Sequence, residues 1–422
     1  MNRRGFLGTA LAGAPLLSAA PAETTFDFDT PYNRLGTDSM KWDAQVRRYG
    51  KNSIVAGMGI SDTDFRTAPS ITKALTERVK HENWGYLEMP QSFIETIISW
   101  NKRHYGIEIN PHQMLLSTGV HPSIVSALRA FSSAGSKVLV LTPTYDGFFG
   151  DISAAGCVRE ECPLRWADGR YHIDLAALDR QITNETKSLI LCNPNNPTGN
   201  AWSAEELTAL GELCTQRGVV VLVDEIHCDF MTKGQKYSPY CLLTNRAVAM
   251  NSVTFKSASK AFSLSAMKCG WMFSGNGDYI KRIAATGHSG DINTLGVVAA
   301  QAAYTGGEDY LKQLVAYIDG NHDYVEQFVR AEIPLIRYKK PQSTYLAWLD
   351  VSAARAKFDT GSPNQTPEQR LQAFLVKEAK VLINAGTNYG VNGAGRMRMN
   401  IATSRRTIEL ALNNIADALR KI

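Results

Sequence analysis

The chain has 422 residues, of which 44% are hydrophobic and 20% are charged. This length allows two or three domains at about 150 residues each, and the composition is that of a globular protein rather than of a disordered or fibrous one. The formal net charge is only +5 and no block of like charges occurs, so nothing indicates nucleic acid as a partner. Because the seven cysteines form no CxxC pair and the eight histidines lack ligand spacing, neither a disulfide framework nor a metal site is expected.

The first 22 residues have the features of an export signal. The string RRGFL at residues 3–7 resembles the RRxFL pattern of twin-arginine signals, an uncharged stretch follows, and the string APA at residues 20–22 offers small side chains for cleavage. The apolar part is too short and too rich in Gly and Ala to span a bilayer. We therefore expect residues 1–22 to be a signal peptide, cleaved or retained, and the protein to be periplasmic or otherwise exported. A cytoplasmic location is the alternative.

Helical and strand-like patterns alternate through the first three quarters of the chain. Helices are expected over residues 70–82, 91–104 and 203–217, and strands over 137–141, 187–192, 219–223 and 253–255. Ser203 followed by Glu206 is a capping box, which marks the start of a helix. The strand-like runs are apolar without alternation, as in strands that are buried on both faces. This pattern predicts a mainly parallel sheet with helices on both sides, an α/β fold.

The pattern changes near residue 305. The remaining expected elements are helices over 307–331, 370–379 and 404–421, strands over 344–350 and 397–401, and a polar loop over 361–369. They predict a second, smaller α+β domain. The expected organisation is a signal over 1–22, an arm over 23–60 that joins the small domain, a large domain over 61–304 and a small domain over 305–422.

Unusual polar residues follow four of the expected strands. The strings are TPTYDGFF (142–149), NPNNPTG (193–199), DEIH (224–227) and KSASK (256–260). In open parallel sheets, ligands bind beyond the carboxyl ends of the strands. Four strand ends therefore supply an aromatic ring, an asparagine, a carboxylate and a lysine to one place, a combination that packing does not explain.

Pyridoxal phosphate catalysis uses this set of side chains. A lysine amine forms a Schiff base with the aldehyde of the cofactor. A carboxylate keeps the pyridine nitrogen protonated, an amide bonds the ring oxygen, and an aromatic side chain stacks on the ring. The phosphate is held at a helix N-terminus and by hydroxyl groups or cations. The four strings thus predict a pyridoxal 5'-phosphate enzyme.

At this point the sequence resembles a known family, the fold-type I pyridoxal-phosphate enzymes of the class I/II aminotransferase superfamily. Within that superfamily it is most similar to the MalY/PatB branch of cystathionine and cysteine-S-conjugate β-lyases, from about residue 26 to 420. The strings that carry the resemblance are RLGTDSMKWD (34–43), WGY (84–86), NPNNPTG (193–199), DEIHCDF (224–230), SKAF (259–262) and STYLAWLD (343–350). The resemblance implies a fold-type I architecture with a large, mainly parallel, seven-stranded-type sheet, and a homodimer with shared active sites.

Carried onto this chain, the resemblance implies roles for the residues at the strand ends. Lys260 would be the Schiff-base lysine and the general base at Cα, and Asp224 would pair with the pyridine nitrogen. Asn196 would bond the ring oxygen O3′, and Tyr145 would stack on the ring. His227 stands where many aminotransferases have a tyrosine that also touches O3′, and we expect it to act in catalysis. The alternative for Tyr145 is a role in the core, and for His227 a structural role.

The resemblance also implies how the phosphate is held. The string STGVHPS (117–123) precedes a helix and would offer the backbone amides of Val120 and His121. Ser257 would add a hydroxyl and Lys268 a cation, at a position where many relatives have arginine. Tyr86 would reach the phosphate from the other subunit, although it could also be a core aromatic.

For the substrate, the resemblance implies that Arg398 binds the α-carboxylate as a fork-to-fork pair. Arg396 is its rival, because it lies two residues away on the same face of an expected strand. Gly59 and Ile60 would line the substrate. They belong to VAGMGISDTDF (55–65), where the MalY/PatB branch usually has a string like WVADMDF. The glycine-containing string is more similar to the substrate loop of aminotransferases, and it keeps transamination as the alternative outcome of the reaction.

The expected activity is that of a carbon–sulfur β-lyase on cystathionine or cysteine S-conjugates, which releases thiol, pyruvate and ammonia. The runner-up is an aminotransferase that moves the amino group of an L-amino acid to a 2-oxo acid. A third possibility is a non-catalytic regulator that binds the cofactor or a partner protein on this fold. The expected partners are a small amino-acid substrate and a second copy of the chain, with no nucleic acid and no membrane span.

Overall fold

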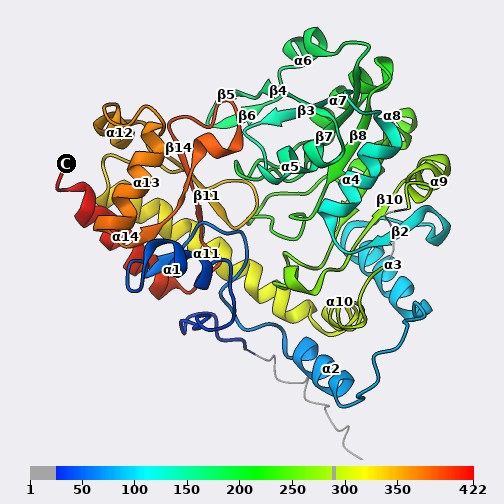
Figure 1. Ribbon diagram of the computed structural model, residues 1–422, viewed down its shortest axis with the longest axis horizontal. Coiled ribbons are helices and arrows are strands. Elements are labelled where there is room, and N and C mark those ends of the chain that lie inside the picture. The colour runs from blue at the N-terminus through cyan, green and yellow to red at the C-terminus, as the bar shows by residue number, and fades with distance from the viewer. Residues whose placement is uncertain (1–24, 288–290) are drawn as a thin grey trace, which may run out of the picture.

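The computed structural model describes residues 25–287 and 291–422, so the signal predicted for residues 1–22 lies outside the described residues. A seven-stranded sheet forms the centre of the larger part (Figure 1), with the order β2-β10-β9-β8-β7-β3-β4. Its strands are β2 (Met114–Ser117), β3 (Lys137–Thr142), β4 (Val158–Pro163), β7 (Thr186–Cys192), β8 (Val220–Asp224), β9 (Ser252–Lys256) and β10 (Gly270–Phe273). Only β10 runs antiparallel to its neighbours among these seven, and the other pairs are parallel. The predicted strands are confirmed as β3, β7, β8 and β9, and the sheet is mainly parallel.

Successive residues of one strand enter two different cores, which explains the unbroken apolar runs. In β3, Val138 and Val140 pack with helices α4 (Val120–Phe131), α5 (Gly147–Ala154) and α9 (Gly277–Ala284). Leu139 and Leu141 face the other side, where they pack with α6 (Leu175–Gln181) and α7 (Ala204–Gln216). A sheet covered on both faces needs apolar side chains at every position of its central strands.

The helix limits follow from local capping. Helix α7 begins after Ser203, and its capping box with Glu206 is present as predicted. Helix α13 (Pro367–Glu378) begins three residues before the predicted start, because Thr366 and Gln369 form a second capping box and Pro367 occupies the first helical position. Helix α2 (Pro69–Val79) likewise begins with a proline, and α3 (Gln91–Tyr105) ends at Gly106 in the left-handed conformation.

The smaller part is built on two short sheets. Strands β11 (Leu346–Asp350), β14 (Arg396–Asn400) and β13 (Asn384–Ala385) form one sheet, and β1 (Ala56–Gly57) pairs with β12 (Val381–Leu382) in the other. Helix α14 (Arg405–Leu419) and α13 cover them, with α12 (Ser352–Arg355) nearby. The pairing of β1 with β12 joins the N-terminal segment to this part of the molecule.

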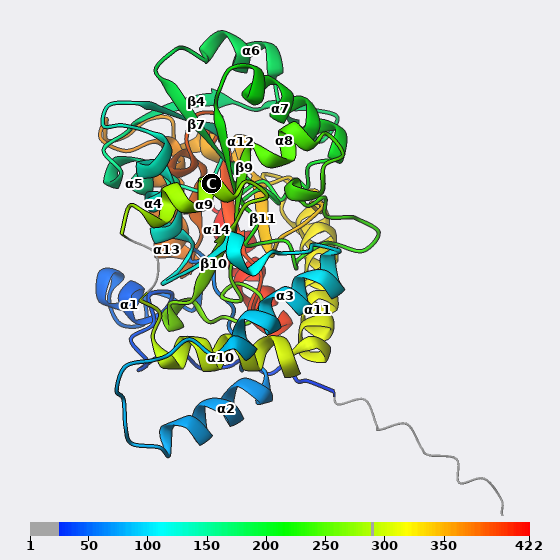
Figure 2. The same cartoon turned by 90° about the vertical axis from the view of Figure 1, so that its right-hand side faces the viewer.

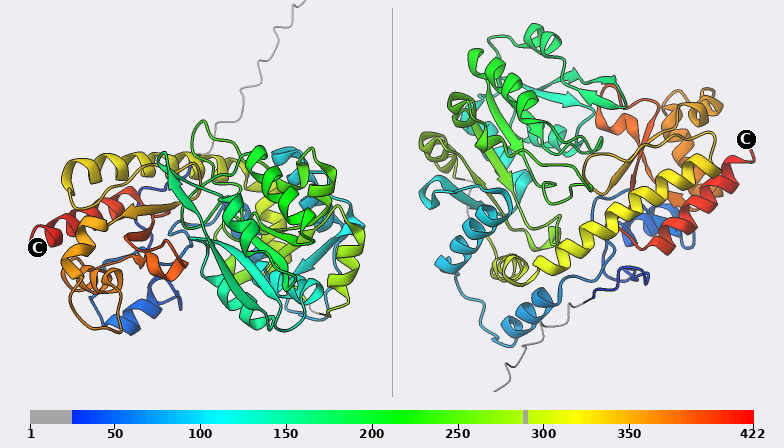
Figure 3. Two further views of the ribbon diagram at one scale, coloured as in Figure 1. Left: turned by 90° about the horizontal axis from the view of Figure 1, so that it is seen from above. Right: turned by 180° about the vertical axis from the view of Figure 1, so that it is seen from behind.

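Helix α11 (Glu308–Glu332) belongs to both parts. Its first half packs with α2, α3 and α10 (Thr294–Gly306), and its second half packs with the short sheets of the smaller part. Figure 3 shows α11 running beside α14 along the back of the molecule, and Figure 2 shows α10 and α2 together below the large sheet. The remaining elements are α1 (Asp43–Tyr49), the hairpin β5 (Arg165–Ala167) and β6 (Arg170–His172), and α8 (Arg246–Met250). Within the described ranges, every helix is too short or too polar to cross a bilayer.

Candidate active site

A cavity of about 600 Å³ lies at the carboxyl ends of β7, β8 and β9. It brings together most of the residues predicted from the strand-end strings. Those that line it are Val120, His121, Tyr145, Asn196, Asp224, His227, Ser257, Lys260 and Lys268. Four predicted residues, Arg398, Gly59, Ile60 and Tyr86, do not line it.

Lys260 lies just beyond β9 with its side chain inside the cavity. Its Nζ donates a hydrogen bond of 2.7 Å to the carbonyl of Ser61. Burial lowers the pKa of Lys260 to about 8, and the charge of Arg398 acts in the same direction, while Asp62 and Asp224 oppose it. A lysine with such a pKa is partly neutral near pH 8, so its amine can act as a nucleophile and as a base.

Asp224 is the last residue of β8 and is buried on the floor of the cavity. One carboxylate oxygen accepts a 3.0 Å hydrogen bond from the backbone amide of Ile226. Burial raises the pKa of Asp224 to about 6, against the opposing effects of the Ile226 amide, His121 and Lys260. No ion pair to Asp224 occurs among the described residues, so this carboxylate is available to a cationic group of a ligand.

Arg398 reaches the site from β14, where it lies between Trp348 of β11 and Asn384 of β13. Its Nη1 donates to Asn196 Oδ1 at 2.9 Å, and its Nη2 donates to the carbonyl of Gly59 at 2.6 Å. The buried Nε of Arg398 has no hydrogen-bond partner within the described part of the chain. A buried guanidinium with an unused donor, placed next to Asn196, is suited to bind a carboxylate.

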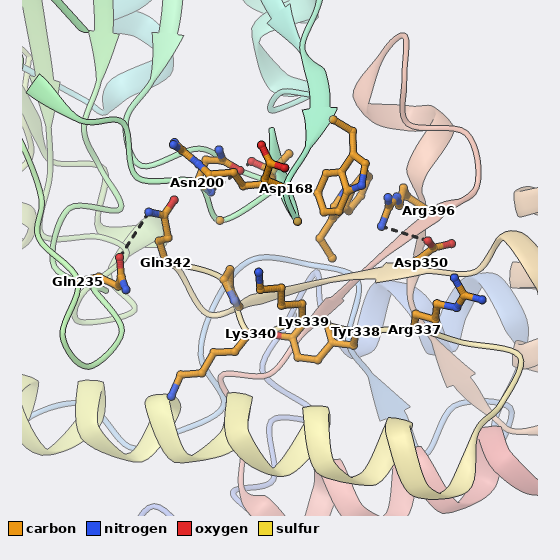
Figure 4. Close-up of a pocket in the computed structure, with 17 residues that line it drawn as sticks. Asp168, Asn200, Gln235, Arg337, Tyr338, Lys339, Lys340, Gln342, Asp350 and Arg396 are labelled. Atoms are coloured by element: carbon orange, nitrogen blue, oxygen red, sulfur yellow. Dashed lines mark hydrogen bonds and ion pairs between the residues drawn. The ribbon is translucent and has the colours of Figure 1, made fainter. Parts of the chain in front are cut away.

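Arg396, the predicted rival, lies in a different cavity. This cavity of about 510 Å³ is lined by the β5–β6 hairpin, residues 198–200 and residues 337–342. Figure 4 shows Arg396 beside Asp350 at the edge of this cavity. The two side chains form an ion pair of 3.6 Å, and the Arg396 guanidinium lies 4.6 Å from the ring centre of Trp166. Both arginines extend from the same face of β14, but only Arg398 contacts residues of the Lys260 cavity.

The histidine predicted for catalysis is held neutral by its surroundings. Burial lowers the pKa of His227 well below its usual value, and the charges of Lys260 and Arg398 lower it further. Its ring lies 5.5 Å from that of Tyr345 in an edge-to-face arrangement. Its Nδ1 has no partner in the ranges that the structure describes, which leaves one ring nitrogen for a ligand.

The sequence predicted a role for the backbone amide of His121, but the side chain of this residue also contributes to the site. Its Nδ1 lies 2.7 Å from Asp151 Oδ2, and its Nε2 lies 3.1 Å from the hydroxyl of Tyr145. The hydrogen bond to Asp151 raises the pKa of His121, although burial opposes this effect. The Asp151–His121 pair therefore supplies a hydrogen-bond partner for the hydroxyl of Tyr145, the ring predicted to stack on the cofactor.

The phosphate end of the cavity is formed by the start of α4. Gly119 caps the helix at φ 146°, a value that side chains disfavour, and Val120 and His121 begin the first turn. The hydroxyl of Ser257 donates to the carbonyl of Cys269 at 2.6 Å, so its proton is used inside the protein. Lys268 lines the cavity with φ 51° and forms no ion pair with another described residue. Helix amides and an unpaired ammonium make an anion site.

The other three predicted residues lie outside the cavity. Gly59 and Ile60 line a smaller cavity of about 230 Å³ and approach the site only through the backbone, since the Gly59 carbonyl accepts from Arg398. Tyr86 is fully exposed, and Trp84 beside it is half-exposed. In this single chain Tyr86 does not line the Lys260 cavity, and its predicted contact with the phosphate of a second subunit stays a prediction.

Sequence reasoning missed several residues around Lys260. The hydroxyl of buried Tyr345 lies 3.1 Å from the Oγ of Ser61 and 3.3 Å from its carbonyl, the same carbonyl that accepts from Lys260. Met40 lines the cavity although it is 68% exposed, and Cys192 also lines it, where its Sγ accepts a hydrogen bond of 3.4 Å from the backbone amide of Asn196. Tyr345 and Met40 belong to strings that carry the family resemblance, and Ser61 belongs to the string over residues 55–65, but no local pattern distinguished these three residues from their neighbours.

The donors and acceptors of the cavity fit pyridoxal phosphate. Asp224 offers an unpaired carboxylate for a protonated ring nitrogen, and His227 and Asn196 offer polar atoms for the ring oxygen. Lys268 and the first turn of α4 would hold the phosphate, and Lys260 offers the amine for the aldehyde. By contrast, no cluster of three or more histidine, cysteine or carboxylate side chains suited to a metal ion occurs in the described residues.

Comparison with known proteins gives consistent results. The chain is 34% identical over 399 residues to cystathionine beta-lyase PatB of Bacillus subtilis, covering 93% of this chain and 100% of the relative. It is 30% identical over 406 residues to protein MalY of Escherichia coli, covering 94% and 100%. Among solved structures, the PLP-bound C-S lyase from Staphylococcus hominis aligns with a TM-score of 0.85 at 30% identity over 93% of this chain and 99% of that one.

Cystalysin from Treponema denticola, whose structure contains a pyridoxal 5'-phosphate cofactor, aligns with a TM-score of 0.87 at 25% identity over 94% of this chain and 100% of that one. The family described as aminotransferase class I and II matches residues 53–415, which include the large sheet, α11 and β14. The chain belongs to the class I and II aminotransferase family and has the fold-type I architecture of its pyridoxal-phosphate enzymes.

Proposed function

We propose that this protein is a pyridoxal-phosphate-dependent carbon–sulfur β-lyase that converts cystathionine or cysteine S-conjugates to a thiol, pyruvate and ammonia. The observation that carries the proposal is Lys260, a partly buried amine with a lowered pKa, in one cavity with the unpaired carboxylate of Asp224 and near Arg398. The relatives named as cystathionine β-lyases and C-S lyases support the choice of reaction.

The bound cofactor would supply an aldehyde for the substrate amine and a ring that draws electrons from Cα. Arg398 would bind the substrate α-carboxylate and so fix the direction of the Cα–H bond. Asp224 would hold a proton at the ring nitrogen, since a carboxylate there favours the charged form of the ring. Lys260 would accept the Cα proton at Nζ, a task suited to an amine with a pKa near the working pH.

Breaking the Cβ–S bond then requires a proton for the departing sulfur. Lys260 Nζ would carry the proton taken from Cα, so it would pass that proton to the thiolate. The three-carbon enamine left after release hydrolyses in water to pyruvate and ammonia. His227, held neutral, would bond the ring oxygen without adding a charge that competes with Asp224.

The second candidate is an aminotransferase, which the family match over residues 53–415 favours. The same residues would serve it, because Lys260 would return the proton to the cofactor carbon instead of to sulfur. The contact between Arg398 and the Gly59 carbonyl is compatible with either outcome. The two reactions differ in whether a sulfur leaving group departs and whether a 2-oxo acid is needed.

We expect the purified protein, loaded with pyridoxal phosphate, to release pyruvate and free thiol from L-cystathionine over many turnovers without added 2-oxo acid. Pyruvate is measured with a coupled dehydrogenase and thiol with a chromogenic disulfide. L-Alanine, which has no leaving group at Cβ, is the control and should yield no thiol. A single turnover to the amine form of the cofactor, reversed by a 2-oxo acid, would instead identify an aminotransferase.

We further propose that the protein acts as a homodimer and is exported. The exposed Tyr86 supports the dimer, since an aromatic side chain that is open to solvent in one chain is free to complete the site of a second.

The string RRGFL at residues 3–7 supports export by the twin-arginine route, which carries folded, cofactor-loaded proteins. A fusion of residues 1–25 to a reporter should reach the periplasm, and replacement of Arg3 and Arg4 by lysine should keep it in the cytoplasm. Equal export of both fusions would exclude this route.

A further inference from the structure

Two cations of the site are held by the backbone of one loop, residues 59–64. The carbonyl of Ser61 accepts from Lys260 Nζ at 2.7 Å, and the carbonyl of Gly59 accepts from Arg398 Nη2 at 2.6 Å. The loop backbone is in turn bound by Asn400, whose side-chain amide donates to the carbonyls of Ile60 and Asp62 at 2.6 and 2.7 Å. The position of this loop therefore sets where the amine and the guanidinium lie.

The same loop carries two carboxylates, Asp62 and Asp64, that are neutralised from the N-terminal segment. Arg34 forms a two-pronged pair with Asp62, with Nη1 to Oδ1 at 2.9 Å and Nη2 to Oδ2 at 3.1 Å. Lys41 Nζ lies 2.7 Å from Asp64 Oδ2 and also donates to the carbonyl of Asp62 at 3.1 Å. The remaining oxygen, Asp64 Oδ1, accepts from Trp42 Nε1 at 2.9 Å and from Arg34 Nη1 at 3.2 Å.

These four side chains, Arg34, Lys41, Asp62 and Asp64, form a charge clasp with equal numbers of cations and carboxylates. The side chains of Lys41 and Asp64 are only 1% and 4% exposed. Burying such charges is unfavourable unless each is paired and hydrogen-bonded. Here all four carboxylate oxygens have a donor, so the clasp is a completed network rather than a chance contact of surface charges.

Lys260 is surrounded by charged groups from several elements, and the clasp contributes one of them. Asp62 faces it from the loop, Asp224 from β8, and Arg398 from β14, while His227 and His121 lie near it from the end of β8 and from α4. Of these, Asp62 and Asp224 favour the ammonium form and Arg398 opposes it. The cations Arg34 and Lys41 lie 2.9 and 3.9 Å from Asp62 Oδ1, so they compensate the negative charge of this carboxylate.

We infer that the charge clasp is a positioning device of the active site, in which Arg34 and Lys41 hold Asp62 and Asp64 so that the loop presents carbonyls, and not an uncompensated negative charge, to Lys260 and Arg398. The effect of the charge clasp on turnover rests on the proposed function, whereas its effect on the protonation of the Lys260 amine does not. The clasp residues are positioning residues, since none of them lines the Lys260 cavity.

Two substitutions that change the charge of the clasp in opposite directions test this inference. In Lys41→Met, Asp62 loses part of its compensation, so the pKa of Lys260 rises, by roughly half a unit or more. In Asp62→Asn, a negative charge beside Lys260 disappears, so the pKa of Lys260 falls. Lys51→Met is the matched control, because Lys51 is exposed on the same segment and the substitution is identical; it should leave the pKa unchanged.

The measurement is competitive acetylation of the cofactor-free protein across pH 6 to 10, with the Lys260 peptide quantified by mass spectrometry. Shifts of opposite sign in Lys41→Met and Asp62→Asn support the inference, and in the loaded enzyme the acid limb of the pH profile of kcat/KM should move in the same two directions. Shifts of the same sign, or none in a folded Asp62→Asn protein, would overturn it. If Lys41→Met does not fold, Asp62→Asn still gives the decisive sign, and Lys41→Arg should behave as wild type. Acetylation uses no substrate, so the pKa of Lys260 can be measured even if the wild type has no lyase activity. A failure of the proposed function is therefore distinguishable from a failure of this inference.

Discussion

Replacing Lys260 with alanine is expected to abolish pyruvate release from L-cystathionine, with kcat lowered at least about 10³-fold, because general base catalysis alone contributes 10²–10⁴. Lys260 and Lys268 are the lysines that line the cavity in the described part of the chain, and Lys268 lies at the phosphate end. The proposed mechanism assigns this proton transfer to no other residue. The measurement is pyruvate formed per minute by variant and wild type, each loaded with pyridoxal phosphate.

The control for this variant is Lys236→Ala, in which an exposed lysine is removed and activity should be unchanged.

Mixing two inactive variants of the chain adds a test of the proposed dimer. A Lys260→Ala chain keeps Tyr86 and a Tyr86→Phe chain keeps Lys260, so dissociation and reassociation of the two variants should restore one complete site per mixed dimer. Full retention of pyruvate release in Lys260→Ala would contradict the proposed mechanism itself.

Replacing Arg398 with alanine is expected to raise the KM for L-cystathionine about 10–100-fold, because a hydrogen bond to a charged group contributes about 1.5–3 kcal/mol and 1.4 kcal/mol corresponds to a factor of ten. A loss of kcat should accompany it, since Arg398 also holds Asn196 Oδ1 and the Gly59 carbonyl. Steady-state kinetics separates the two effects.

The matched control is Arg396→Ala, on the same strand face two residues away. Arg396 contacts Asp350 and Trp166 in the neighbouring cavity, so its removal should change the KM by less than about twofold. A substrate analogue without the α-carboxylate, such as an S-conjugate of cysteamine, should bind wild type and Arg398→Ala equally well. If Arg396→Ala raised the KM more than Arg398→Ala, the carboxylate site would be misassigned.

The sequence determined the architecture because the pattern of burial is local. In β3, neighbouring residues enter two cores, and this requirement appears as an unbroken apolar run that can be recognised without a structure. The Ser203–Glu206 capping box is likewise contained in four residues. The strings after β7, β8 and β9 placed Asn196, Asp224 and Lys260 at one edge, because the carboxyl ends of parallel strands meet there.

The tertiary structure alone decided how the site is completed. Arg398 and Arg396 share a strand face, and only the docking of β14 between β11 and β13 brings one to Asn196 and the other to Asp350. The clasp joins residues 34 and 41 to the loop of residues 59–64, and the loop joins Lys260 through a carbonyl that any residue could supply. A backbone carbonyl leaves no trace in the residue type, and contacts between segments some 200 or 340 residues apart leave none in a local pattern. The residue types of the site could therefore be recognised in the sequence, whereas the positions of the Lys260 amine and the Arg398 guanidinium depended on folding.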